Sequence, residues 1–178
     1  MKIKEINDEY FEQLTIEGMP GNLYRSQMPM SLYDDSSEYL VPAWIENEIT
    51  HVVCMQMQDE MERYTAMNLP IEYYQEFGLK YIWHPTPDHH GSDDTEKLLT
   101  DARFVYNLMS KKVNVVIHCH AGIGRTGMFI AAMLISAGFN TQQAVNSVRK
   151  SSKRLKYSIN KMQYECLIEV ENLAEALS

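Results

Sequence analysis

The sequence predicts an α/β fold in which a mainly parallel central sheet of about four or five strands is flanked by helices. Short β-type runs alternate with helical patterns along the 178 residues, as they do where helices connect parallel strands. An apolar share of 45% is enough to build a hydrophobic core. No internal repeat, low-complexity tract or linker-like segment divides the chain, so we expect one domain over residues 1–178.

Four short runs have the composition of β-strands. They are Leu23–Arg25, Thr50–Cys54, Lys80–Trp83 and Val113–Cys119. The last run is apolar and leads directly into a glycine-rich segment. We expect these runs to form the sheet.

Two helical segments flank the glycine-rich segment. Asp93 is expected to cap a helix, with Glu96 three residues later completing a capping box. Apolar residues then recur at helical spacing at Leu98, Leu99, Ala102, Val105 and Met109. Residues 128–135 are apolar nearly all round and end before Gly138, which is typical of a buried helix.

Two further helices are expected near the end of the chain. Thr141 can cap a short helix that ends near Arg149. Asn160 can start a last helix whose buried side would carry Met162, Cys166, Leu167, Val170, Leu173 and Leu177.

The charge and the cysteines exclude several classes of protein. A formal net charge of -8 argues against nonspecific binding to nucleic acid or acidic membranes. No apolar run has the length of a membrane span. The three cysteines are too widely separated for a disulfide framework, so we expect a soluble, cytoplasmic protein. We also expect a monomer.

Residues 119–127 read Cys-His-Ala-Gly-Ile-Gly-Arg-Thr-Gly and have the composition of an anion-binding turn between a strand and a helix. Backbone N–H groups in such a turn can converge on phosphate oxygens, and the helix N-terminus adds positive potential. Arg125 offers a planar guanidinium that can contact two phosphate oxygens at once. The phosphate-binding positions are expected to be His120, Ala121, Gly122, Ile123, Gly124 and Arg125.

Cys119 lies at the mouth of this predicted turn. Positive surroundings of this kind favour the thiolate form of a cysteine, which is the nucleophile. Thr126 could donate a hydrogen bond to the sulfur and assist its later departure. His118, which precedes the nucleophile, is expected to hydrogen-bond to the loop backbone.

These residues resemble the signature of the cysteine-dependent protein tyrosine phosphatase superfamily, which is a histidine and a cysteine, five residues, an arginine, and a serine or threonine. His118-Cys119, Gly122, Arg125-Thr126 and Gly127 carry the resemblance. The short chain is similar to small atypical dual-specificity phosphatases of the kinase-associated phosphatase type. The resemblance implies the protein tyrosine phosphatase fold and runs from Leu23 to Gln163.

Members of this family supply a general acid from an upstream loop, and the resemblance places it at Asp88. This residue follows a β-type run and precedes Cys119 by 31 positions, in a segment rich in proline and glycine. Asp93 and Asp94 are rivals, although Asp93 suits a helix cap better. The implied reaction passes through a phosphocysteine on Cys119, with Asp88 first as acid and then as base and Arg125 stabilising charge.

The resemblance implies hydrolysis of phosphotyrosine, with phosphoserine or phosphothreonine as further substrates, in a phosphorylated protein partner. An inositol phosphate or phosphoinositide is the alternative substrate, although the loop holds His120 and Ile123 where such enzymes often place lysines. An alternative of another class is a phosphate-binding pseudophosphatase or scaffold. Retention of Cys119, Arg125 and Asp88 weighs against it.

The remaining histidines, cysteines and basic residues have less specific interpretations. None of the histidines has the spacing of a zinc site, so no metal and no cofactor are expected. His89 and His90 are candidates for the substrate rim. Five of the sixteen Lys and Arg residues lie within residues 149–156, either as a solvated helix end or as a second anion site in which Lys153 and Arg154 join the rim. Cys54 and Cys166 are expected to be core thiols, with a protective Cys54–Cys119 disulfide as a less favoured possibility.

Overall fold

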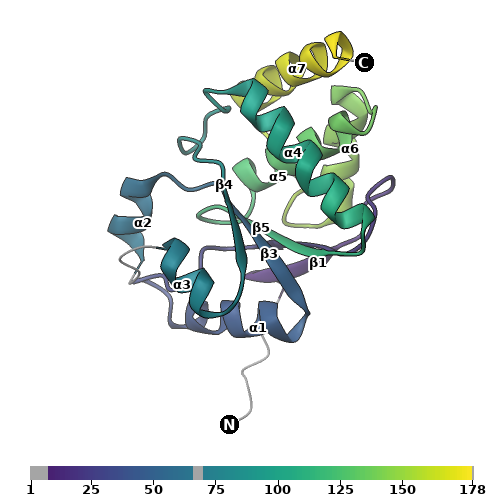
Figure 1. Cartoon of the computed structure of the whole chain (residues 1–178). Helices are drawn as coiled ribbons and strands as arrows, with labels where there is room; N and C mark the ends of the chain where they lie inside the picture. The colour runs from purple at the N-terminus through teal and green to yellow at the C-terminus, as the bar shows by residue number, and fades with distance from the viewer. Residues whose placement is uncertain (1–7, 66–69, 178) are drawn as a thin grey trace.

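The sheet lies at the centre of the molecule, between two groups of helices (Figure 1). The computed structural model describes residues 8–65 and 70–177. In this part of the chain the sheet has five strands in the order β1-β2-β5-β3-β4. Only the β1–β2 pair is antiparallel, and the other three pairs are parallel. The predicted fold class is confirmed.

The four predicted strands all form, with small changes at their ends. They are β2 (Leu23–Ser26), β3 (Ile49–Cys54), β4 (Lys80–Trp83) and β5 (Asn114–His118). Both neighbours of β5 end level with it, since Ser26 on one side and Cys54 on the other are in register with His118. Cys119 therefore leaves the carboxyl edge of the sheet at its middle strand. The edge strand β1 (Phe11–Leu14) was not among the predicted runs.

Helices cover both faces of the sheet (Figure 1). One face carries α1 (Leu40–Glu46) and α3 (Pro70–Glu76), and an apolar cluster that includes Trp44 and Tyr74 packs beneath them. The other face carries α4 (Thr95–Ser110), α5 (Gly124–Ser136), α6 (Thr141–Ser151) and α7 (Lys161–Ala176). A short 3-10 helix (Asp35–Tyr39) and α2 (Gln58–Tyr64) complete the described helices.

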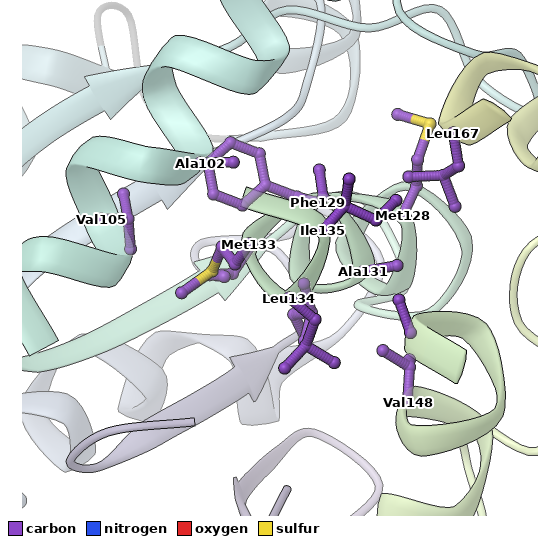
Figure 2. Close-up of a cluster of buried hydrophobic side chains, with 14 of the residues drawn as sticks. Ala102, Val105, Met128, Phe129, Ala131, Met133, Leu134, Ile135, Val148 and Leu167 are labelled. Atoms are coloured by element: carbon purple, nitrogen blue, oxygen red, sulfur yellow. The ribbon is translucent and has the colours of Figure 1, made fainter. Parts of the chain in front are cut away.

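Helix α5 is the centre of the larger core (Figure 2). Every residue of α5 from Arg125 to Ile135 is buried. Side chains of α4, α6 and α7 surround it, among them Ala102, Val148 and Leu167 (Figure 2). The predicted buried helix is confirmed, and its N-terminus is held rigidly at the glycine-rich segment because the rest of the helix is packed on all sides.

Two of the three predicted helix caps are wrong by one residue. The Asp94 side chain, not that of Asp93, accepts a hydrogen bond from the Lys97 amide at the start of α4. Glu96 accordingly makes no capping box. The capping box of α6 begins at Asn140, because Thr141 turns inward and donates to the Leu167 carbonyl at 3.1 Å.

The last helix is confirmed at its start and partly wrong on its buried side. Asn160 caps α7 in a capping box with Gln163. Cys166, Leu167 and Val170 are buried and Leu173 is partly buried, as predicted. Met162 and Leu177 are instead 49% and 69% exposed, because the side of α7 that packs on α4 and α5 does not extend to them.

Within the described residues, no helix is long and apolar enough to cross a membrane.

Candidate functional site

The glycine-rich segment follows β5 and leads into α5, as predicted. Met28 donates its amide to the His120 carbonyl at 3.0 Å, so the chain leaving β2 supports the loop. Gly122 has φ of +69°, and a Cβ at this position would lie 2.2 Å from the Ser26 carbonyl oxygen. Only glycine fits here, because both the conformation and the close approach exclude a side chain.

The His118 side chain is buried and links the loop backbone to Tyr74 of α3. Its Nδ1 lies 3.3 Å from the Cys119 carbonyl and its Nε2 lies 2.8 Å from the Tyr74 hydroxyl. Burial lowers the pKa of His118 to about 4, so the ring is neutral at neutral pH. A neutral ring can donate from Nδ1 to the carbonyl and accept the Tyr74 hydroxyl proton at Nε2. The expected hydrogen bond to the loop backbone is confirmed.

Arg125 is 1% exposed and held by a carboxylate that sequence reasoning did not identify. Glu60 of α2 binds it through both oxygens, with Nη1–Oε2 at 2.5 Å and Nη2–Oε1 at 2.9 Å. Nη1 also donates to the Thr86 carbonyl at 2.9 Å. Burial alone would lower the pKa of Arg125, but the Glu60 hydrogen bonds and the nearby charges of Cys119, Glu60 and Asp88 together outweigh it, and the pKa is raised. The guanidinium is thus a fixed positive charge.

Asp88 reaches the same guanidinium from the opposite loop. Its Oδ1 lies 3.1 Å from Arg125 Nη2, and its side chain is 54% exposed. Arg125 Nε has no hydrogen-bond partner among the described residues. A phosphate can therefore bind Nε directly and must compete with Asp88 for Nη2, which would free the Asp88 carboxyl beside the phosphate.

Most of the predicted catalytic and phosphate-binding residues meet in a hollow of about 400 Å³ at the carboxyl edge of the sheet, although Gly122 and Thr126 do not line it. Cys119 is 3% exposed and lies at this hollow. The predicted residues that line it are Asp88, His89, Cys119, His120, Ala121, Ile123, Gly124 and Arg125. The segment between α6 and α7 supplies the opposite wall with Tyr157, Ser158, Ile159, Asn160 and Gln163.

Three predicted rim residues do not line this hollow. His90 lines a separate, more acidic hollow with Glu165 and Glu169. The Arg154 guanidinium lies 3.4 Å from the Glu9 carboxylate. Lys153, next to it, is exposed and also lies outside the lining.

Thr126 is fully buried directly after Arg125. Its hydroxyl has no hydrogen-bond partner among the described residues. An unpaired buried hydroxyl is costly, so its persistence at this position fits a role in the reaction. The hydrogen bond to the Cys119 sulfur remains a prediction.

All three cysteines are buried free thiols. Burial raises the pKa of Cys54 to about 12, and it also raises the pKa of Cys166. Both are therefore inert at neutral pH, as expected of core thiols. Cys54 lies at the end of β3 beside the loop, but no disulfide joins it to Cys119.

The contributors to the site that sequence reasoning missed include Arg25, Glu60, Tyr74 and Tyr157. Arg25 is fully buried beside the loop and paired with Glu12, whose Oε2 is 2.9 Å from Nε. A charged residue inside a β-type run was a usable signal for Arg25. Glu60, Tyr74 and Tyr157 had none, because the fold brings them to the loop from distant parts of the sequence.

No group of three or more His, Cys, Asp or Glu side chains within residues 8–65 and 70–177 is arranged to hold a metal ion. The chemistry of the site is that of a thiol, an arginine and a carboxylate.

Comparison with known proteins connects this site to a family. The family described as "Dual specificity phosphatase, catalytic domain" matches residues 32–173. The cyclin-dependent kinase inhibitor 3 of Rattus norvegicus is 29% identical over 92 residues, which cover 51% of this chain and 42% of that protein. The chain thus spans less than half the length of this curated relative.

Solved structures are similar over nearly the whole chain. A crystal structure of kinase associated phosphatase, with a serine at its catalytic-site cysteine, has a TM-score of 0.81 at 19% identity and covers 97% of this chain and 99% of that one. PTPMT1 in complex with PI(5)P has a TM-score of 0.70 at 18% identity, covering 87% and 93%. At these identities the two structures establish a likeness of fold.

Proposed function

The chain belongs to the dual-specificity phosphatase family, and on this premise we propose that it hydrolyses phosphotyrosine, and phosphoserine or phosphothreonine, in proteins. The observation that carries the proposal is the meeting of Cys119, Arg125 and Asp88 in one hollow. These are a nucleophile, an anion-binding group and a proton donor, which are the three groups that the reaction needs.

In the first step the Cys119 thiolate attacks phosphorus and the phosphorus–oxygen bond to the substrate breaks. Asp88 donates its proton to the departing oxygen, which leaves as an alcohol or phenol. Arg125 and the loop amides bind the equatorial oxygens throughout, so the developing charge meets donors that are already in place. Glu60 fixes the guanidinium for this purpose.

In the second step water attacks the phosphocysteine. Asp88, now a carboxylate, takes a proton from the water as the sulfur–phosphorus bond breaks. Inorganic phosphate and the Cys119 thiolate are released, and Asp88 is again protonated for the next cycle. The Thr126 hydroxyl would stabilise the departing thiolate.

The surroundings of the hollow favour an aromatic phosphoester among the substrates. Tyr157 lines the hollow and is 84% exposed, so its ring can pack against the ring of a phosphotyrosine. Arg125 is the only Lys or Arg residue between Cys119 and Thr126, which gives little support to a polyanionic inositol phosphate as the substrate. The structural likeness to PTPMT1 keeps that alternative open to experiment.

We propose the cytoplasm as the compartment of this reaction. Cys119 must remain reduced to act as a nucleophile, and the three thiols are all unpaired. A reducing compartment maintains both conditions.

Turnover of a substrate panel tests the proposed function. Phosphotyrosine, phosphothreonine and phosphoserine peptides are assayed beside inositol phosphates and a phosphoinositide, with Cys119→Ser as the control for contaminating activity. The proposal predicts turnover of phosphopeptides, with phosphotyrosine fastest, and none by Cys119→Ser. Preference for the inositol compounds would support the alternative substrate class. Binding without turnover by the wild type would indicate a pseudophosphatase.

A further inference from the structure

A buried histidine closes the base of the loop that carries Asp88. His84, directly after β4, is 1% exposed. Its Nε2 lies 2.9 Å from the hydroxyl of Ser92, at the other end of the loop. Its Nδ1 lies 2.8 Å from the Asp101 carboxylate on α4. One imidazole thus connects the two ends of the 84–92 loop and attaches both to α4.

The Asp101 carboxylate is itself held in place by Lys97. Lys97 donates to Asp101, and the same ammonium donates to the Trp83 carbonyl at 3.1 Å. Burial alone would raise the pKa of Asp101, but hydrogen bonds from His84 and Lys97 outweigh it and the pKa is lowered. An ionised Asp101 accepts a hydrogen bond from Nδ1 and so fixes the orientation of the imidazole, with Nε2 turned toward the Ser92 hydroxyl.

The position of Asp88 depends on such backbone anchors. Its side chain is 54% exposed, so packing does not hold it over the hollow. It lies in a tight turn closed by the His90 amide and the Pro87 carbonyl at 3.1 Å. The returning arm of the loop, residues 89–92, is held where Asn160 donates to the His89 carbonyl at 2.7 Å.

The next residue of the arm is packed as closely. A Cβ at Gly91 would lie 2.6 Å from the Cβ of Cys166 on α7. The His84–Ser92 contact adds a direct tie between the end of this arm and the end of β4.

A hydroxyl, an imidazole and a carboxylate in this order also occur in Ser-His-Asp triads. Here the Ser92 hydroxyl lies 3.0 Å from the Asp94 carbonyl and 3.2 Å from the Asp94 amide. The oxygen is therefore enclosed by its own loop, and the arrangement suits a structural tie.

We propose that His84 is a positioning residue for the general acid, and that Ser92 and Asp101 hold its ring in the required orientation. The tie keeps Asp88 within reach of the leaving oxygen without touching the substrate. The inference rests on the proposed function, because it presupposes that Asp88 donates the proton.

The test compares two substrates that differ in their need for the acid. Ser92→Ala removes one end of the tie, and His84→Gln removes the imidazole. On phosphotyrosine we expect kcat/KM to fall about 10-fold in Ser92→Ala and about 100-fold in His84→Gln. Neither loss should exceed that of Asp88→Asn, for which we expect about 10²–10⁴-fold. On an activated aryl phosphate, whose leaving group hardly needs a proton, the loss should stay within about 3-fold.

Two comparisons separate positioning from general destabilisation. Ser110→Ala is the matched control, because it removes a serine hydroxyl that donates to the Tyr106 carbonyl at the far end of α4. Ser92→Thr keeps a hydroxyl and should restore most of the activity on phosphotyrosine. In an Asp88→Asn background, Ser92→Ala should cause no further loss, since there is no acid left to position.

The outcomes are distinct. Equal losses on both substrates, or a loss that persists in the Asp88→Asn background, would show that the tie only supports the fold. If thermal melting shows that His84→Gln does not fold, the two Ser92 variants decide the question. If Asp88→Asn loses activity equally on the two substrates, the proposed acid and this inference are both overturned. If Asp88→Asn loses more on phosphotyrosine but Ser92→Ala does not, the inference alone is overturned.

Discussion

Replacing Glu60 by Gln tests the part of the site that came only from the structure. Glutamine keeps the shape of the side chain and one acceptor, but it removes the negative charge and offers an N–H₂ group to Arg125. Removing one partner of a buried ion pair costs about 3–5 kcal/mol. The isostere still accepts one hydrogen bond, so we expect about 1.5–3 kcal/mol, the contribution of a hydrogen bond to a charged group.

If this energy orients Arg125 for the transition state, kcat/KM should fall about 10- to 100-fold. The assay measures kcat/KM on 4-nitrophenyl phosphate and on a phosphotyrosine peptide, together with the affinity for vanadate. The losses should be similar on the two substrates, because Arg125 binds the phosphoryl group that both share. The free energy of unfolding in urea should fall by about 1.5–3 kcal/mol.

Glu62→Gln is the matched control on the same helix. Glu62 accepts a hydrogen bond at 2.8 Å from the exposed Gln58, away from Arg125. This variant should retain wild-type activity. Wild-type kcat/KM and vanadate affinity in Glu60→Gln would refute the reasoning, because Arg125 would then need no anchor.

Three further predictions address the general acid Asp88, the phosphate-binding loop and the buried His118. Asp88→Asn should lose about 10²–10⁴-fold in kcat on phosphotyrosine and far less on an activated aryl phosphate; the same dependence in Asp93→Asn instead would reassign the acid. Gly122→Ala should lower kcat/KM at least about 10-fold, because a positive φ costs about 1–2 kcal/mol and the clash with the Ser26 carbonyl adds to it. Gly78→Ala, with φ of +72° and open space around it, is the control that should remain active. His118 should lower the free energy of unfolding by about 3 kcal/mol between about pH 7 and pH 4. In the unfolded chain His118 takes up a proton near its ordinary pKa of about 6.5, whereas in the folded chain it stays neutral until about pH 4. Protonation therefore favours the unfolded chain as the pH falls. Urea unfolding of His118→Asn should show a weaker pH dependence, and an unchanged one would contradict this assignment.

The fold was largely predictable because its strands and its central helix have clear local patterns. The runs that became β2 to β5 and the apolar segment in α5 are compatible with few other structures. Strand β1 has no such pattern, since its pairing with β2 is decided by tertiary contacts. The caps at Asp94 and Asn140 were displaced by one residue because adjacent polar residues can all cap, and the exit angle of the chain selects among them.

The phosphate-binding loop was predictable because its residues are contiguous. Its supports were not, because Glu60, Tyr74 and His84 come from separate elements and only the sheet topology brings them to the loop. The basic run misled for a related reason. Charge clusters in the sequence over residues 149–156, but Arg149 donates to the Ser158 and Ile159 carbonyls and Arg154 pairs with Glu9, so neither of these charges reaches the hollow.

The central claim is that the phosphoryl group passes through Cys119. Rapid acid quenching during turnover of a phosphotyrosine peptide, followed by mass spectrometry of the peptide that contains residue 119, measures this directly. We predict one phosphoryl group on Cys119 in the wild type and none in Cys119→Ser. Turnover by Cys119→Ser, or a phosphoryl group found on another residue while Cys119 stays unmodified, would contradict the account.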